Sequence, residues 1–411
     1  MQNAEPQPRS AALIEGSGHL LQLLRHRGAQ TITELAAEMD VSRSTVIQRL
    51  DFLGEAHIVE SSVAAALGRG RPAAVYQFNP RAGLVLAVQV GLTGCRVAVT
   101  DLLGDVLSNE LVSVDFARGA AVLLDTLTDT FDAMVTALDR PNSEVVGIGV
   151  GIPSVVELQN YARNLGTDVQ SWDRNLFRTV LRARYDAPVF LDLDVNLLAR
   201  AEWRMSWSSV EVCVCVKLGT LIDAAIVVHG NPVRGASGLA GELGHIKVSG
   251  TNTACSCGGF GCLDTVASGD ALVQELKASG MDVSHVSEVV ALANNGDPRA
   301  IRSVREAGRR IGEALSSVVN LLNPSVIIAW GYLTDADTSL FAGIREGLYQ
   351  KALPGSSEDV QLVKTKLGAL AGVRGAALLV LDEVLDADAL DRMLLTQSWS
   401  QASPNPVGTF A

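Results

Sequence analysis

The stretch that decides the fold runs from Gly241 to Asp264 and reads GELGHIKVSGTNTACSCGGFGCLD. Its four metal-ligand candidates are His245, Cys255, Cys257 and Cys262. Three thiolates and one imidazole complete a tetrahedral shell, which structural zinc prefers and which leaves no position for a catalytic water. Glycines between the thiols allow tight turns. The spacing therefore predicts a structural Zn²⁺ site.

Two other interpretations of these residues are a buried histidine beside free thiols and a set of disulfides. Four ligand types within so short a stretch disfavour the first. No signal peptide precedes the six cysteines, so we expect a reducing cytoplasm, which disfavours the second. Cys95, Cys213 and Cys215 lie in apolar runs and are interpreted as small core residues.

The motif Glu242-Leu243-Gly244-His245, followed by Cys255-x-Cys257-Gly258-x-x-Gly261-Cys262, resembles the signature of the ROK family of bacterial sugar-responsive repressors and sugar kinases. The resemblance extends in weaker form over most of the chain. It implies that His245 both ligates zinc and faces a sugar, and that Glu242 and Asp264 bind sugar hydroxyls. Asp264 stands where the family usually has the longer Glu.

Length and charge limit the possibilities further. A chain of 411 residues indicates two or three domains. No apolar run reaches the roughly 18 to 20 residues needed to cross a membrane, so we expect a soluble cytoplasmic protein. A net charge of −12 argues against binding nucleic acid over the whole surface. Any contact with DNA must be local.

The N-terminal region has the pattern of a helix-turn-helix. Leucines recur at helical spacing from Ser17 to Arg27, and Gly28 is a plausible end. Thr33 is expected to cap a short helix, ELAAEM, and Ser42 a second helix that begins at Arg43. The predicted packed side consists of Leu35, Ala36, Val41, Val46, Ile47, Leu50 and Leu53.

The opposite side of the second helix carries donors suited to the edges and phosphates of a DNA major groove. These DNA-binding candidates are Arg43, Ser44, Thr45, Gln48 and Arg49. The strand pattern of residues 57–78 adds a wing, whose tip presents Arg69 and Arg71 to a narrow minor groove. An ordinary helical hairpin and a plain charged loop are the alternatives. The first lysine of the chain is Lys217, so cationic contacts here come from arginine.

After the winged helix (1–80), strands alternate with crossover helices, which predicts an α/β fold with a largely parallel sheet. The order resembles the actin-like, ribonuclease H-like lobe that ROK proteins contain twice. The first lobe is expected over 81–194, completed by a helix near 374–386, and the second over 195–373. From 387 to 411 we expect a disordered tail.

The phosphate motifs that the resemblance calls for are degenerate. An aspartate that holds magnesium in kinases is replaced by Gln89, and an amide cannot replace the anion. The second phosphate loop reads Gly219-Thr220-Leu221-Ile222-Asp223, with bulky and acidic side chains in place of glycines. The sequence therefore predicts that the protein is not an enzyme.

The remaining sugar-site residues come from the same resemblance. Asp194 matches the kinase base at the C-terminal end of a strand, although a helix-capping role is the alternative. Leu193 replaces a usual Asn. Asn164 matches a sugar-binding Asn in a loop that also contains Trp172.

These features predict a winged-helix transcription regulator, a repressor of carbohydrate-related genes, modulated by a sugar or sugar derivative. One rival is a ROK regulator with a degenerate pocket, controlled by a protein partner or by no ligand. The remote rival is a sugar kinase. The expected partners are an inverted-repeat DNA operator, a sugar or sugar-phosphate effector, and further copies of the chain in a homodimer or homotetramer.

Overall fold

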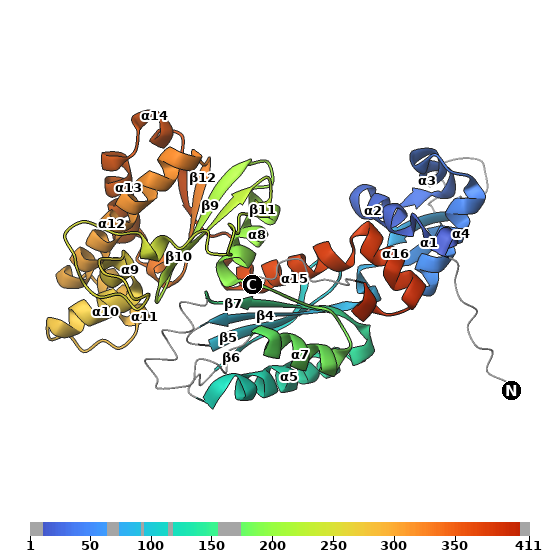
Figure 1. Ribbon diagram of the computed structural model, residues 1–411, viewed down its shortest axis with the longest axis horizontal. Helices are drawn as coiled ribbons and strands as arrows, with labels where there is room; N and C mark the ends of the chain where they lie inside the picture. The colour runs from blue at the N-terminus through green and yellow to red at the C-terminus, as the bar shows by residue number, and fades with distance from the viewer. Residues whose placement is uncertain (1–10, 64–73, 92–93, 114–117, 155–173, 403–411) are drawn as a thin grey trace.

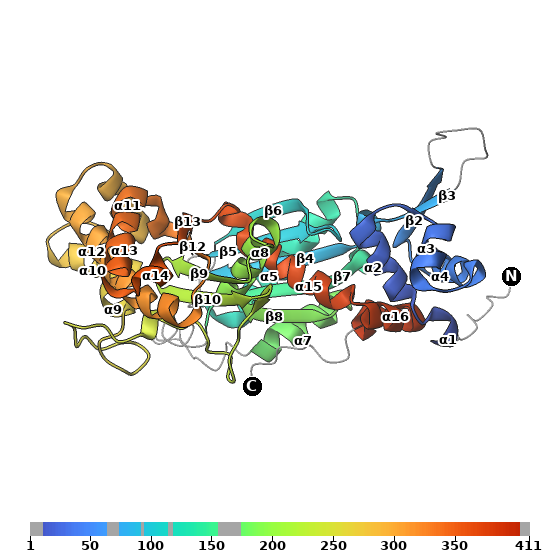
Figure 2. The same cartoon turned by 90° about the horizontal axis from the view of Figure 1, so that it is seen from above.

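The computed structural model describes residues 11–63, 74–91, 94–113, 118–154 and 174–402. Three bodies follow one another along the long axis of the molecule (Figures 1 and 2). The N-terminal domain lies at one end, a first α/β lobe in the middle and a second α/β lobe at the other end.

The N-terminal domain is a winged helix, as predicted. Its three strands form an antiparallel sheet in the order β1-β3-β2. Buried leucines from three helices, with Ile58, form its core. Its elements are α1 (Ala11–Ile14), α2 (Ser17–Arg27), β1 (Gln30–Thr31), α3 (Ile32–Met39), α4 (Arg43–Glu55), β2 (Val59–Val63) and β3 (Ala74–Phe78).

The helix ends of this domain confirm two predicted signals and correct one. Gly28 ends α2, and the Ser42 hydroxyl caps α4 by accepting a hydrogen bond from the Thr45 amide at 3.2 Å. The cap of α3 is Thr31, not Thr33. Thr31 and Glu34 form a capping box, which Thr33 cannot form because it lies inside the helix.

The two lobes share one topology. Each sheet has its first three strands antiparallel and its last two parallel, in the order 3-2-1-4-5 along each lobe's own strands. This repetition confirms the duplicated ribonuclease H-like fold. The expected largely parallel sheet is wrong, because only two residues separate β4 from β5 and three separate β9 from β10, and such short connections join antiparallel strands.

The first lobe is centred on five strands, β4 (Leu84–Gly91), β5 (Gly94–Thr100), β6 (Val106–Val112), β7 (Val145–Ile152) and β8 (Val189–Leu193). Its helices are α5 (Gly119–Ala137), α7 (Arg174–Tyr185) and, from the far end of the chain, α15 (Ala371–Val384). Figure 1 shows α5 and α7 on one face of this sheet and α15 on the other. A helix from late in the chain thus packs against β4 and β7 of the first lobe.

The second lobe carries the sheet of β9 (Val212–Leu218), β10 (Ile222–Val228), β11 (Asn231–Pro232), β12 (Val326–Trp330) and β13 (Gln361–Lys364). Its helices are α9 (Asp264–Ala267), α10 (Gly269–Ala278), α11 (Val286–Asn294), α12 (Pro298–Leu322), α13 (Asp337–Lys351) and α14 (Pro354–Ser357). Helix α8 (Asp194–Ser206) lies between the lobes and packs against α15 and β10. It is almost fully buried through Glu202.

The expected disordered tail is wrong for residues 387–402. Helix α16 (Ala387–Thr396) and a short turn (Trp399–Gln401) follow α15, and α16 packs against α2 of the N-terminal domain. The reason is an apolar stripe, Ala389, Leu390, Met393 and Leu394, that is buried in the core shared with that domain. The rest of the predicted tail lies outside the described residues.

Within the described parts of the chain, none of the helices combines the length and the apolar character needed to cross a membrane.

Candidate metal centre, interlobe cleft and DNA-binding surface

The predicted zinc ligands converge on one point. One ligand atom from each of His245, Cys255, Cys257 and Cys262 lies within 4.8 Å of the other three. The sulfurs of Cys257 and Cys262 are 3.6 Å apart, and the Cys255 sulfur is 3.6 Å from His245 Nδ1. Zinc with bonds to sulfur of about 2.3 Å holds its sulfur ligands roughly 3.8 Å apart. The donor set therefore fits a tetrahedral ion.

The backbone that brings these donors together needs glycine. Gly258 and Gly261 have φ angles of 87° and 68°, in the left-handed region that side chains disfavour. The Gly258 amide donates to the Cys255 carbonyl oxygen, and the Cys255 amide donates to that of Gly259. A tight knuckle results, with Cys255 and Cys262 buried and Cys257 exposed.

Polar neighbours adjust the charge of this cluster. The Lys247 ammonium donates to the Cys262 sulfur at 2.9 Å. Burial, with Lys247 nearby, lowers the pKa of His245, so the ring is neutral, as metal ligation requires. Because Nδ1 faces the thiols, Nε2 faces Glu242, whose carboxylate lies 3.6 Å away. A carboxylate in that place fixes the histidine tautomer.

The other three cysteines are core residues, as interpreted from the sequence. Cys95 lies on β5, and Cys213 and Cys215 lie on β9, all with no exposed surface. Burial raises the pKa of Cys95 and of Cys213 to about 12. They are thiols without nucleophilic character at neutral pH.

A cavity of about 320 Å³ separates the two lobes. Gln89, Gly91 and Asp194 line it from one side, and Lys217, Thr220 and Trp330 from the other. Its position at the C-terminal ends of β4 and β9 is where α/β sheets place ligands.

Asp194 lines this cleft and is 1% exposed. It is the first residue of α8, and its carboxylate makes an ion pair with Lys217 of β9 at 2.8 Å. The alternative role as a helix cap is not observed, because the N-cap is Leu193 and has no side-chain hydrogen bond. The pair joins the first residue of α8 to the second lobe.

The other predicted sugar ligands are placed differently. The Asp264 carboxylate accepts a hydrogen bond from the Ile222 amide at 2.8 Å, so it supports the loop between β9 and β10. Glu242 and His245 lie together beside the metal cluster. Of the described candidates, Asp194 alone is among the residues that line the cleft. Asn164 lies outside the described residues.

The two stretches that were compared with kinase phosphate motifs also face the cleft. Gln89 is nearly buried, and its amide packs against Gly372 at the start of α15. In the second loop the carbonyl oxygens of Gly219 and Thr220 accept hydrogen bonds from the first amides of α10. Those amides are the donors that a phosphate would otherwise use.

The candidate DNA-binding residues do not all share one surface. Arg43 and Ser44 are exposed on α4, and Thr45 and Gln48 are half-buried. Ile47, predicted to be packed, is 45% exposed. The face of α4 that contacts the core is narrower than the pattern of apolar residues predicted. Arg69 and Arg71 of the wing lie outside the described residues.

Arg49 departs from the predicted arrangement. It is half-buried, and its guanidinium packs closely against Gly16, just before α2. Burial raises the pKa of Asp391 on α16, and nearby Arg49 opposes that rise. Arg49 therefore faces the junction with α16 rather than the exposed side of α4.

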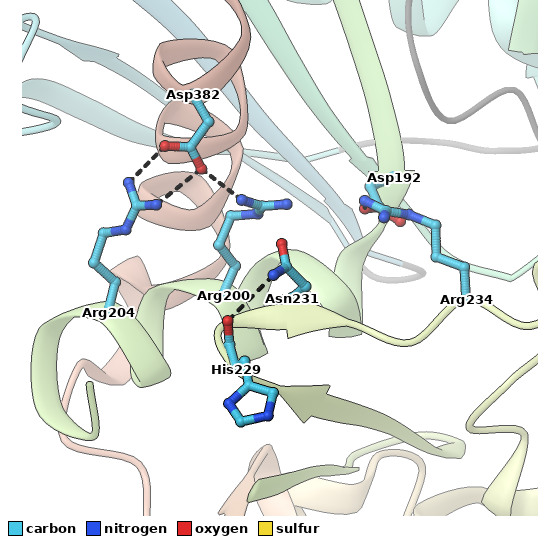
Figure 3. A network of polar contacts seen from close by, with 7 residues as sticks. All are labelled: Asp192, Arg200, Arg204, His229, Asn231, Arg234 and Asp382. Atoms are coloured by element: carbon cyan, nitrogen blue, oxygen red, sulfur yellow. Dashed lines mark hydrogen bonds and ion pairs between the residues drawn. The ribbon is translucent and has the colours of Figure 1, made fainter. Parts of the chain in front are cut away.

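A polar network that sequence patterns did not indicate surrounds α8 (Figure 3). Asp382 of α15 accepts hydrogen bonds from Arg200 at 2.5 Å and from Arg204 at 2.7 and 3.0 Å. Asp192, at the end of β8, accepts from Arg234 at 2.6 Å and from the Asn196 amide at 2.8 Å. The only sequence signal was the number of arginines on one short helix.

Comparison with known proteins adds two family matches. The model described as the ROK family matches residues 85–383. The one described as bacterial regulatory protein, arsR family, matches residues 19–61. The two matches coincide with the α/β lobes and the helix-turn-helix.

Individual relatives divide into two groups by the share of the chain they cover. The xylose repressor of Caldicellulosiruptor bescii is 23% identical over 86% of this chain and 92% of its own length. The glucokinase of Halalkalibacterium halodurans is 28% identical over 72% of this chain and 94% of its own. A crystal structure of a ROK family transcriptional regulator, a homologue of the Escherichia coli MLC protein, superposes with a TM-score of 0.75. It shares 25% identity and covers 95% of this chain and all of its own.

Proposed function

The chain belongs to the ROK family, and on that premise we propose that it is a DNA-binding transcriptional repressor of carbohydrate-related genes whose effector is a sugar or sugar derivative. One observation carries the proposal. The winged helix and both ROK lobes occur in one chain, and regulators of this family align over nearly all of it. The glucokinase, in contrast, leaves more than a quarter of the chain unmatched.

The decisive experiment is selection of DNA from a random double-stranded library by the full-length protein. We expect enrichment of an inverted repeat, because a two-fold assembly imposes its symmetry on the operator. Light scattering of the complex distinguishes a homodimer from a homotetramer. Failure to enrich any sequence, with folded protein at low salt, would contradict the proposal.

The DNA contact is assigned to α4 and the wing. Arg43, Ser44, Thr45 and Gln48 are proposed to read the major groove, so that Arg43→Ala costs about 1 to 3 kcal/mol on the selected operator. Arg49 was included on sequence grounds, but its contact with Gly16 supports a positioning role instead. Arg69→Ala/Arg71→Ala should lower the salt dependence of binding and weaken it most on A·T-rich flanks.

The metal is proposed to be Zn²⁺, held by His245, Cys255, Cys257 and Cys262. The donor chemistry and the observed spacing support it. When bound, the ion supplies a cross-link of the knuckle and no open position for chemistry. Metal analysis of freshly purified protein should find about one zinc per chain.

Kinase activity is not proposed. Gln89 lacks the charge that magnesium needs, and Lys217 already neutralises Asp194, the position of the kinase base. A coupled assay with common hexoses and ATP should show no turnover above the rate without sugar.

The effector is assigned to the region of Asn164, Asp194, Glu242, His245 and Asp264. A regulator with a degenerate pocket remains the competing function, and two contacts favour it: Asp194 is paired with Lys217, and Asp264 bonds Ile222. Calorimetry against a panel of sugars and sugar phosphates separates the two. If a sugar binds the parent protein and its heat of binding disappears in Glu242→Gln, the result supports a sugar effector. If no sugar of the panel binds, the result supports the regulator with a degenerate pocket.

A further inference from the structure

The geometry points to α8 as the element that transmits the state of the interlobe cleft to the DNA-binding domain, with Asp382 of α15 as the residue that passes it on. This inference rests on the proposed function and deepens it, since it names the residues through which the ligand site would regulate DNA binding. It requires contacts at both ends of α8 and a rigid connection between them.

At the cleft end, α8 is tied to the second lobe. Its first residue, Asp194, is buried and paired with Lys217 of β9. Both residues line the cavity, so a ligand hydroxyl that takes up the Asp194 carboxylate competes with Lys217. Occupation of the cleft therefore changes what holds the start of α8.

Along its length, α8 is fixed to α15. A methyl group on Gly375 of α15 would overlap the carbonyl oxygen of Leu197, so the two helix backbones touch at that point. Two turns further along α15, Asp382 accepts hydrogen bonds from Arg200 and Arg204 of α8 (Figure 3). Because close-packed helices cannot slide independently, a shift of α8 moves α15 with it.

At the far end, α15 and α16 hold α2 of the N-terminal domain. The Gln22 side chain donates to the Leu385 carbonyl oxygen. Burial lowers the pKa of Arg25 on α2, and Asp382 is the neighbour that counteracts this effect. Asp391 accepts hydrogen bonds from the amides of Gly16 and Gly18 at 2.8 and 2.7 Å.

Two arginines of α8 bind the Asp382 carboxylate, and Arg25 of the winged helix is near enough for that carboxylate to influence its pKa. Arg25 comes from the winged helix, and Arg200 and Arg204 come from α8. A 13-residue helix spans about 20 Å, so α8 connects the cleft to this junction without an intermediate. If α8 moves, its two arginines move Asp382 and α15 with it, and α2 follows through the contacts of Leu385 and Asp391.

The test perturbs the cleft end and asks whether the other end responds. Lys217→Met removes the partner of Asp194 and imitates its loss to a ligand. Amide hydrogen exchange of α2 is measured in the full-length protein without DNA or sugar. We expect at least a roughly five-fold change in exchange rate, in the range of ordinary allosteric couplings. The dissociation constant for the selected operator should change by a similar factor.

Asp382→Asn then tests the connection. In the Asp382→Asn protein, Lys217→Met should change the amide exchange rate of α2 and the operator affinity by less than about two-fold. The reason is that a shift of α8 no longer reaches α15 through this carboxylate. The matched control is Asp388→Asn, the same chemical change at an exposed position of α16, where the full response to Lys217→Met should persist. If Lys217→Met does not fold, Asp194→Asn replaces it.

Three results would overturn the inference: no response of α2 to the cleft variant in folded protein, an undiminished response in Asp382→Asn, or an equal loss of response in Asp388→Asn. A merely structural Asp382 would lower stability and leave the response ratio unchanged. If the parent protein binds no DNA, the proposed function fails, whereas the exchange measurement still decides this inference.

Discussion

The metal knuckle belongs to the second lobe and the cleft lies between the two lobes, and their polar groups are arranged in opposite ways. In the knuckle, three thiols and a neutral imidazole face one another, and Lys247 donates a hydrogen bond to one of the sulfurs. In the cleft, Asp194 pairs with Lys217, and Asp335 pairs with Lys364 at 2.6 Å. The donors of the knuckle therefore suit an ion supplied from outside, whereas these acidic groups of the cleft are paired with lysines of the chain.

This difference indicates what each region contributes. When ligand side chains come together only in the folded chain, the free energy of metal binding adds to the free energy of folding. A site whose charges are already paired can be occupied or empty with little change in stability, which suits a sensor. Asp264 joins the two regions, since it lies two positions after Cys262 and bonds Ile222, the neighbour of the cleft residue Leu221.

The sharpest contrast is loss of the metal. Cys262→Ser, or exhaustive chelation, should remove an apparent stabilisation on the order of 10 kcal/mol from the second lobe. Thermal unfolding, followed together with zinc content, measures it. A melting temperature unchanged by chelation would remove the distinction between the knuckle and the cleft.

The cleft should respond to single and paired changes differently. Lys217→Met leaves a buried carboxylate without its partner and should cost about 3 kcal/mol in the free energy of unfolding. The double variant Asp194→Leu/Lys217→Met should recover most of that cost, since it removes both charges. Chemical denaturation of the four proteins of this cycle gives the coupling directly. If the costs of the two single variants simply add up in the double variant, the two side chains do not stabilise each other, and the predicted coupling is wrong.

A smaller effect, on zinc affinity, is expected from replacing Lys247, whose ammonium group contacts the Cys262 sulfur. Lys247→Met should weaken zinc affinity about 10- to 100-fold, because it removes the hydrogen bond to the Cys262 sulfur. Competition with a chromogenic chelator measures the affinity. Lys277→Met, an exposed lysine on α10, is the control and should retain the parent affinity. Equal affinities for all three proteins would leave Lys247 without a role in the knuckle.

The smallest effect on stability is expected from replacing Asp264, which lies between the knuckle and the cleft. Asp264→Asn keeps an acceptor for the Ile222 amide and loses only the charge, so it should cost about 1 kcal/mol in unfolding. Zinc content should not change. A loss of zinc in this variant would show that the knuckle depends on the edge of the cleft, and the contrast between them would narrow.

Local signals explain which parts of this molecule were predictable. Gly28 ends α2, Ser42 caps α4, and the four metal donors converge, because each depends on neighbours within about twenty positions. The family resemblance supplied the duplicated lobes. The cap of α3 was misplaced by two residues because Thr31 and Thr33 are both suitable cap residues, and only Glu34 at the third position distinguishes them.

The unpredicted features depend on contacts between distant segments. The Asp194 carboxylate meets Lys217 only because two strands of different lobes end at the same cleft. Arg49 was assigned to the DNA face because helical periodicity alone could not show that Gly16 lies against it. The stripe of α16 has a partner only when α2, from the other end of the chain, is in place.

That last contact also has a consequence for synthesis. Asp391 binds the amides of Gly16 and Gly18 across 375 residues of chain. The winged helix ends at Phe78, so at about 5 to 20 residues per second it is complete roughly 15 to 65 seconds before Asp391 of α16 is synthesised. During that interval the winged helix has no contact with α16. A nascent or truncated chain therefore presents the DNA-binding domain without the lobes that are proposed to regulate it.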